Sequence, residues 1–192
     1  MKNNTYFHII SKYFSTIPDA KGIEYLEDCL EETTFKKGES PIQFSKYHNF
    51  AYIIIHGAAR SYCIKKDKEF NLWFAFENDT VASIQNYNGK PAKETVTFLE
   101  VTHCLKIDLP KLLLYSKTDF ICSNFIRALL EDYIDFLETR LGIFQFHEGL
   151  ERYLHILENE PALIQRIPLT YLASYLGISR ETLSRLRAKA AL

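Results

Sequence analysis

The residues best suited to chemistry lie near the C-terminal end of the sequence, on a predicted helix that begins after Ser179. Its outward side chains are mostly cationic, namely those of Arg180, Glu181, Ser184, Arg185, Arg187 and Lys189. Arginine can make paired hydrogen bonds to guanine, and glutamate can accept one from cytosine. The Ser179 and Thr182 hydroxyls, with the helix N-terminal amides and the Arg187 and Lys189 cations, suit DNA phosphates. This pattern indicates a surface for double-stranded DNA.

A helix–turn–helix pattern surrounds this surface. The buried face of the preceding helix is predicted to consist of Leu169, Leu172, Ala173 and Leu176. Gly177 can adopt the left-handed conformation that ends a helix, and Ser179 is a good N-cap for the next one. Leu183 and Leu186 would hold the second helix inward. The spacing alone fits equally well an ordinary pair of helices with a solvated charged face.

The rest of the sequence changes character along the chain. From about residue 7 to residue 33 the apolar residues, including Leu30, have a loosely helical spacing. Residues 35–108 read as short strands separated by turns, such as Lys37-Gly38-Glu39 and Lys66-Asp67-Lys68, which favours a small antiparallel barrel or sandwich. Further helices are predicted over residues 148–159, ended by Pro161, and from Pro168 onward.

One amphipathic helix is predicted over residues 119–144. Its apolar stripe contains Ile126, Leu130, Tyr133, Leu137 and Phe144. Such a stripe could pack on the barrel of its own chain. A helix of this length with a near-heptad stripe more readily buries that stripe against a second copy, so we expect a homodimer through Ile126, Leu130, Tyr133 and Leu137.

Composition narrows the class of protein. The 192 residues are 47% hydrophobic and 24% charged, with a net charge of −1, which is typical of a globular protein. No apolar run approaches the ~18 residues that span a bilayer, and the N-terminus does not resemble a secretion signal. A cytoplasmic protein without membrane contact is therefore expected.

Cysteine and histidine positions argue against a metal site or an enzyme. Cys29, Cys63, Cys104 and Cys122 are far apart, and none has a histidine at metal-ligand spacing. The six histidines are dispersed, and no nucleophile–base motif occurs. We expect four reduced thiols buried in the core, no metal and no catalytic residues.

Several segments together resemble the Crp/Fnr family of bacterial transcription regulators. Ser179-Arg-Glu-Thr-Leu-Ser-Arg185 resembles the recognition-helix signature of that family. Other segments similar to Bacteroidetes-type members are 35–39 (Phe-Lys-Lys-Gly-Glu), 56–60 (His-Gly-Ala-Ala-Arg), 73–77 (Trp-Phe-Ala-Phe-Glu), 150–154 (Leu-Glu-Arg-Tyr-Leu) and 166–169 (Arg-Ile-Pro-Leu). The resemblance implies an α+β fold with an N-terminal cyclic-nucleotide-binding-like β-roll (jelly roll), a long dimerisation helix and a C-terminal winged-helix-like helix-turn-helix domain. It also implies that Arg180, Glu181 and Arg185 contact bases.

The effector positions depart from the family pattern. Members that bind cyclic AMP carry a Gly-Glu pair, followed about ten residues later by an Arg-Ser or Arg-Thr pair. Here Ala82 and Ser83 replace the first pair, and Ala92 and Lys93 replace the second. The missing carboxylate and guanidinium would make charge-assisted hydrogen bonds worth about 1.5–3 kcal/mol each. The sequence therefore disfavours a cyclic nucleotide and predicts no cofactor, although Lys93 could still meet a phosphate.

These observations predict a sensor β-roll with N-terminal helices over residues 1–115, a dimerisation helix over 116–145 and a DNA-binding domain over 146–192. The predicted function is transcription regulation by a homodimer that reads an inverted repeat, with RNA polymerase and an unidentified small-molecule effector as further partners. The alternative is a small-ligand sensor with weak or vestigial DNA binding.

Overall fold

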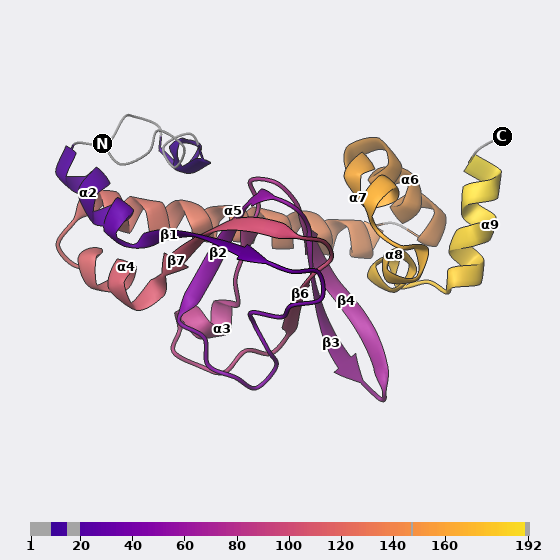
Figure 1. Ribbon diagram of the computed structural model, residues 1–192. Coiled ribbons are helices and arrows are strands. Elements are labelled where there is room, and N and C mark those ends of the chain that lie inside the picture. The colour runs from indigo at the N-terminus through magenta and orange to yellow at the C-terminus, as the bar shows by residue number, and fades with distance from the viewer. Residues whose placement is uncertain (1–8, 15–19, 147, 191–192) are drawn as a thin grey trace. The chain divides into compact units, whose positions relative to one another are not determined.

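The computed structural model describes residues 9–14, 20–146 and 148–190, and most of its elements are labelled in Figure 1. The helices are α2 (Ala20–Asp28), α3 (Ile84–Tyr87), α4 (Leu109–Tyr115), α5 (Phe120–Phe146), α6 (Gly149–Asn159), α7 (Pro161–Arg166), α8 (Leu169–Leu176) and α9 (Arg180–Ala190). The strands are β1 (Leu30–Phe35), β2 (Phe50–His56), β3 (Ala59–Lys65), β4 (Lys68–Ala75), β5 (Thr80–Val81), β6 (Thr95–Phe98) and β7 (Thr102–Asp108).

The chain divides into two compact units. The first comprises residues 1–61 and 75–133, and the second comprises residues 62–74 and 134–192. The second unit therefore joins the tip of the β3–β4 hairpin to the C-terminal half of α5 and to the helices α6–α9. The three-part division predicted from the sequence stays a prediction.

The first unit is built on an antiparallel sheet with the strand order β1-β7-β2-β5. Its register pairs Leu30 with Ile107 and Ile107 with Ala51, so that these apolar residues lie side by side. The core under this sheet is formed by residues that are at most 9% exposed, among them Ile10, Leu26, Leu30, Ile53, Leu105, Leu112 and Phe125. Burial of such side chains stabilises the fold by roughly 1.5–3 kcal/mol each.

The other strands form a sheet with the order β4-β3-β6. The turn between β3 and β4 is tight, since Lys66 and Asp67 have left-handed φ angles of 51° and 59°. Two consecutive residues of this conformation are typical of the hairpin turn that matches strand twist. The turn predicted at Lys66-Asp67-Lys68 is therefore confirmed.

The N-terminal region corrects one prediction. Leu30 was expected on a helix, but the helix ends at Asp28 and Leu30 begins strand β1. Pairing with Ile107 in the central strand β7 decides this, because apolar spacing alone does not distinguish a short buried strand from a helix. The short helices α3 and α4 were not predicted.

The helical part of the second unit largely follows the sequence signals. Helix α6 ends at Asn159 as expected, but Pro161 does not only stop it: Pro161 also begins helix α7. Proline suits the first helical turn because its missing N–H would have no intrahelical partner there. Pro168, expected as the first helical residue, is instead the N-cap of α8. The described residues after Gly149 contain helices and no strand.

Helix α5 runs from Phe120 to Phe146 without a break, which confirms the predicted long helix. The predicted dimer residues of α5 differ in burial along the helix. Ile126 is only 7% exposed and belongs to the core of the first unit, so it is not available for a dimer contact as the sequence suggested. Leu130 and Tyr133 are half-buried, whereas Leu137 is exposed.

The structure corrects the prediction that all four thiols lie in the core, because Cys63 does not. Cys29, Cys104 and Cys122 are buried and free, and Cys63 is half-buried and free. Burial raises the pKa of Cys29, Cys104 and Cys122 to about 12, because an apolar environment disfavours the thiolate. Within the described ranges, no helix is both long and apolar enough for a membrane span.

Candidate nucleic-acid interface

The turn between α8 and α9 has the local geometry that its sequence predicts. Gly177 adopts φ 70° and ψ 28°, the left-handed conformation that ends α8. The N–H of Ile178 donates to the carbonyl of Ala173 at 3.0 Å, and the N–H of Gly177 donates to that of Ser174 at 3.2 Å. These bonds satisfy carbonyls that would otherwise lack a partner at the helix end.

Ser179 caps the N-terminus of α9. Its Oγ accepts a hydrogen bond from the N–H of Thr182 at 3.0 Å, and the Thr182 hydroxyl lies 3.0 Å from the same oxygen. Both hydroxyls proposed for phosphate contact are therefore also engaged with each other. The capping fixes where the helix starts and, with it, which side chains of α9 point outward.

The inward face of this helix pair is apolar and closely packed. Leu172, Ala173, Leu176 and Leu183 are each at most 2% exposed, and Leu186 is half-buried. Tyr175 is also buried, which the sequence did not predict. An alternating small and large face lets two helices approach closely, as a helix-turn-helix requires.

The predicted base-contacting residues lie together on the exposed face of α9. Arg180, Glu181 and Arg185 are exposed, as are Ser184 and Arg187. Hydrogen bonds from the Glu181 backbone N–H and the Ser179 hydroxyl, with attraction from Arg180 and Arg185, lower the pKa of Glu181. The carboxylate is thus ionised and available as an acceptor at neutral pH. The side chain of Lys189 lies outside the described residues.

An arginine behind this surface holds α8 in place. Arg140, on α5, donates from Nη2 to the carbonyl oxygen of Tyr175 at 3.0 Å, and its guanidinium carbon lies 3.8 Å from the Tyr175 ring centroid. The same guanidinium and that of Arg152 each lie 4.7 Å from the ring centroid of Phe144. Sequence reasoning missed this cluster, because nothing in the pattern links residue 140 to residue 175.

The predicted effector positions carry one polar and one charged side chain, Ser83 and Lys93, beside two alanines, Ala82 and Ala92. Ser83 is 1% exposed at the N-cap position of α3, and its Oγ is buried without a hydrogen-bond partner among the described residues. Ala92 is 2% exposed, Ala82 is half-buried and Lys93 is exposed. Four further buried polar residues lie in the first unit, namely Arg60, Ser61, Asn86 and Thr102. Asn86 donates from Nδ2 to the Lys90 carbonyl at 3.0 Å.

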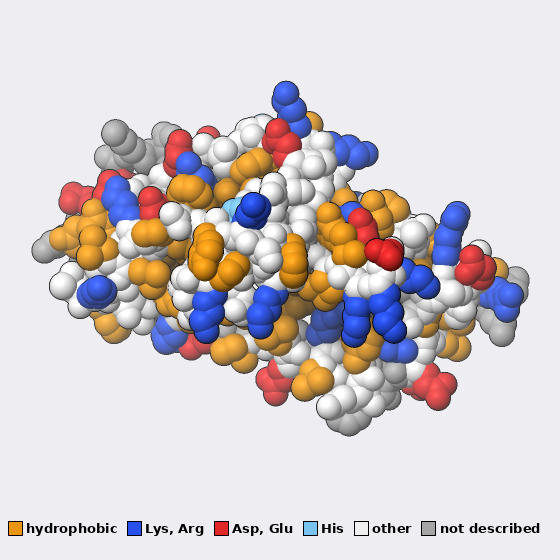
Figure 2. All heavy atoms as spheres, turned by 90° about the horizontal axis from the view of Figure 1, so that it is seen from below, with side chains coloured by type: hydrophobic (Ala, Val, Ile, Leu, Met, Phe, Trp, Pro, Cys, Tyr) orange, Lys and Arg blue, Asp and Glu red, His pale blue; other side chains and the backbone are white. Residues whose placement is uncertain are grey.

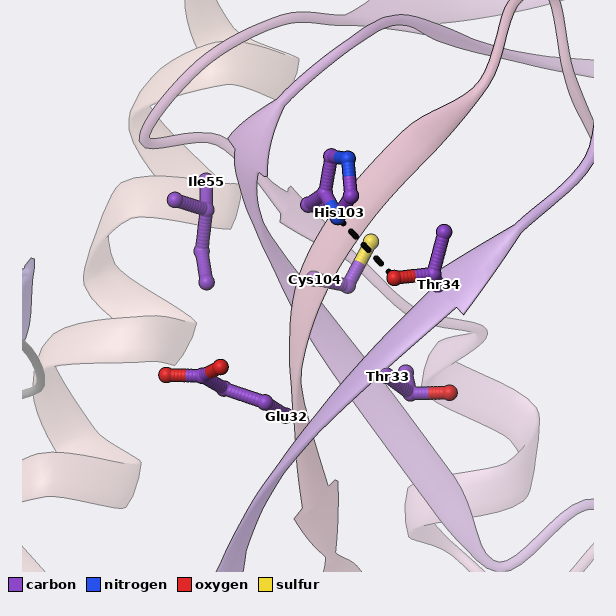
Figure 3. A pocket seen from close by; sticks show the side chains of 6 residues that line it. All are labelled: Glu32, Thr33, Thr34, Ile55, His103 and Cys104. Carbon is purple, nitrogen blue, oxygen red and sulfur yellow. Dashed lines mark hydrogen bonds between the residues drawn. The ribbon is translucent and has the colours of Figure 1, made fainter.

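A separate cavity of about 440 Å³ opens beside strands β1, β2 and β7. It is lined by Glu32, Thr33, Thr34, Ile55, His103 and Cys104, as Figure 3 shows. Thr34 Oγ1 and His103 Nδ1 are 2.9 Å apart. None of the predicted effector residues lines this cavity. Among the residues that the structure describes, no group of three or more histidine, cysteine or acidic side chains could hold a metal ion.

In the C-terminal half of α5, the exposed apolar side chains are shifted from the predicted dimer stripe. Ile134, Leu137 and Leu141 are 60%, 44% and 58% exposed. With Phe144 they follow the three–four spacing of a coiled-coil seam. The sequence identified Leu137 and missed Ile134 and Leu141, because it extended the stripe from the buried Ile126.

Comparisons with known proteins identify the fold. No family model and no curated sequence matches the chain. Solved structures do match: FixK2 from Bradyrhizobium japonicum superposes with a TM-score of 0.70 and 17% identity over 83% of each chain. The c-di-GMP-responsive regulator CLP from Xanthomonas campestris gives 0.67 and 18%, covering 90% of this chain and 92% of its own.

A protein from Eubacterium rectale that is assigned to the Crp/Fnr family gives a TM-score of 0.66 at 18% identity, over 91% of this chain and 85% of its own. Together with the antiparallel sheets, the long α5 and the helices that follow it, these matches confirm the predicted α+β fold. The chain has the fold of Crp/Fnr-type regulators, with a β-roll of the cyclic-nucleotide-binding kind.

Proposed function

We propose that the protein is a homodimeric transcription regulator of the Crp/Fnr type that reads an inverted repeat through α9. The observation that carries this proposal is the exposed trio Arg180, Glu181 and Arg185 on a helix whose start is set by the Ser179 cap. In a helix-turn-helix, the N-terminal part of the second helix enters the major groove. The trio occupies the first two turns of α9, where that entry occurs.

Charge supports the same function. The chain carries a net charge of −1, yet the exposed face of α9 carries Arg180, Arg185 and Arg187 against Glu181 alone. Local cationic charge next to groups that can read base edges is the arrangement expected of sequence-specific DNA binding.

A second copy of the chain is the proposed occupant of the apolar seam on α5. Exposed Ile134, Leu137 and Leu141 would be covered by the same residues of a partner helix. A two-fold dimer would present two α9 helices to DNA half-sites about one helical turn, ~34 Å, apart.

The proposed regulator does not respond to cyclic AMP in the family manner. Ala82, Ser83 and Ala92 carry neither a carboxylate for a ribose nor a guanidinium for a cyclic phosphate. The Lys93 side chain is exposed, so it offers one solvated charge. A thermal-shift titration with cyclic AMP is expected to leave Tm unchanged, whereas a ligand at 100 times its Kd would add about 2.7 kcal/mol.

The deciding experiment is selection of binding sites from a randomised duplex pool with the ligand-free protein, followed by a salt titration on the selected site. An enriched inverted repeat, whose affinity falls steeply as salt rises, is the expected result. If neither the protein alone nor the protein with cell extract enriches any sequence, DNA reading is wrong. Sedimentation of the same sample tests the dimer.

A further inference from the structure

The tip of the β3–β4 hairpin carries a group of lysines that α9 does not use. Lys65, Lys66 and Lys68 surround the turn, with Asp67 as the only acidic residue between them. All four side chains are exposed. No carboxylate oxygen of another described residue lies within 4.0 Å of a lysine Nζ at this turn. These cations are therefore open to an external anion.

The hairpin is fastened to helix α8 by polar contacts. The backbone N–H of Asn71 donates to Ser174 Oγ at 3.1 Å, and the Ser174 hydroxyl donates to the carbonyl of Glu69 at 3.1 Å. Asn71 Nδ2 donates to the carbonyl of Tyr171 at 3.4 Å. One serine hydroxyl thus bridges two backbone positions of β4, and the Asn71 side chain extends the attachment by most of a helical turn.

Apolar packing reinforces this attachment. The Phe74 and Tyr175 rings meet edge to face, with centroids 5.2 Å apart. Asn71 is 3% exposed and Tyr175 is 5% exposed, so these two side chains are shielded from water. The hairpin tip and the helices α8 and α9 accordingly belong to the same compact unit, and the lysines are carried with the proposed DNA-reading helix.

Helix α8, to which the hairpin is attached, is the first helix of the proposed helix-turn-helix. When the second helix of a helix-turn-helix lies in the major groove, the first helix crosses the phosphate backbone. An element fixed to α8 is thereby carried next to phosphates that α9 does not reach. Figure 2 shows Lys and Arg side chains gathered, with a few acidic ones, where the hairpin and these helices lie in that view.

We propose that Lys65, Lys66 and Lys68 form a second contact surface for the DNA phosphate backbone, positioned by the Asn71–Ser174 attachment. The inference rests on the proposed function and adds a partner-binding element outside the helix-turn-helix. Lysine binds a phosphate as a point charge and reads no base, so this surface contributes affinity without sequence preference.

The test compares two matched double variants in salt titrations on the selected operator and on a scrambled duplex. Lys66→Gln/Lys68→Gln removes two charges from the hairpin, and Lys36→Gln/Lys37→Gln removes two from an exposed turn of the first unit. In the hairpin variant, the slope of log affinity against log salt concentration is expected to fall by about 1 per lysine. Binding to the operator and binding to the scrambled duplex are expected to weaken equally. The control is expected to keep the wild-type slope.

A third variant tests the attachment. Ser174→Ala removes the bridging hydroxyl and leaves the hairpin charges intact. If the attachment positions the lysines, Ser174→Ala lowers the slope of the salt dependence of DNA binding. Adding Lys66→Gln/Lys68→Gln to Ser174→Ala then lowers that slope by less than the same two substitutions do in the wild type. A conformational-stability measurement of Ser174→Ala accompanies the titration, so that unfolding is not mistaken for lost contact.

The outcomes are distinct. If the hairpin variant keeps the wild-type salt dependence of DNA binding, the inference is wrong. That result is expected if these lysines bind an acidic protein surface instead. Equal losses in the hairpin and control variants also overturn it, because the effect would then be one of total charge. If the wild type itself binds neither duplex, the proposed function has failed, and the inference fails with it.

Discussion

The guanidinium of Arg140 lies 3.8 Å from the ring centroid of Tyr175 and donates a hydrogen bond to the Tyr175 carbonyl at 3.0 Å. One side chain of α5 thus holds both the ring and the backbone of a residue near the end of α8. Burial is the largest cause acting on Arg140 and lowers its pKa, whereas electrostatic attraction to Tyr175 and a side-chain hydrogen bond with Tyr175 oppose that shift. The cation is retained because its contacts replace part of the lost hydration.

Replacement of Arg140 tests how much this contact stabilises the helical unit. Arg140→Gln removes a cation–π contact of about 1–2 kcal/mol and a charge-assisted hydrogen bond of similar size. We expect the free energy of unfolding to fall by about 2 kcal/mol, measured by chemical denaturation. The matched control Arg127→Gln, on an exposed part of the same helix, is expected to change stability by less than about 0.5 kcal/mol. Equal effects would contradict the role of Arg140.

Gly177 is expected to tolerate asparagine better than alanine. Its φ of 70° disfavours any residue with a Cβ, and a Cβ there would lie 3.4 Å from Cε1 of Phe144. Gly177→Ala should therefore cost about 1–2 kcal/mol of stability and weaken DNA binding by misplacing α9. Asparagine visits the left-handed region more readily, so Gly177→Asn should cost less. Thermal unfolding of both variants checks the order, and an equal loss in both would point to crowding against Phe144 instead.

Substitutions of Arg185 and of Arg187 are expected to affect DNA binding in different ways. Arg185→Ala should cost about 1–3 kcal/mol of operator binding and relax base preference at one position in each half-site. Arg187→Ala should weaken operator and scrambled duplexes equally and lower the salt slope by about 1. Binding titrations of both variants on both duplexes separate these effects. Should Arg185→Ala bind the two duplexes in the wild-type ratio, its assignment to a base is wrong.

The buried thiols predict an alkaline loss of stability. The pKa of Cys29, Cys104 and Cys122 is about 12 in the folded protein, against an ordinary value of 9.0. Because the pKa of each thiol is higher in the folded than in the unfolded protein, its contribution to the free energy of unfolding is complete below pH 9. That contribution is lost as pH rises from about 9 toward 12. Each cysteine should destabilise the fold by about 1 kcal/mol between pH 8 and pH 10.

Denaturation curves at several pH values measure how the free energy of unfolding changes with pH. Cys104→Ala should remove about a third of the thiol contribution, even though the variant is less stable at every pH. A variant with the wild-type slope would show that other groups cause the alkaline loss. In the folded protein, iodoacetamide should modify the half-buried Cys63 before the three buried cysteines.

Much of the local structure could be read from the sequence. The stop at Gly177, the cap at Ser179, the turn at Lys66-Asp67 and the extent of α5 each depend on residues within a few positions of one another. Turn and capping preferences act over this short range, so they are visible in a linear sequence. The exposed cationic face of α9 follows from the same signals.

The tertiary structure decided which of several locally permitted arrangements each segment adopts. Leu30 joins a strand because Ile107 lies opposite it, and Ile126 is buried because the core of the first unit covers it, which leaves Ile134 and Leu141 on the free face of α5. Asn71 meets Ser174 across 103 residues of sequence. Such contacts depend on the packing of the whole unit, and no pattern confined to one segment of the sequence encodes which distant side chain will be its neighbour.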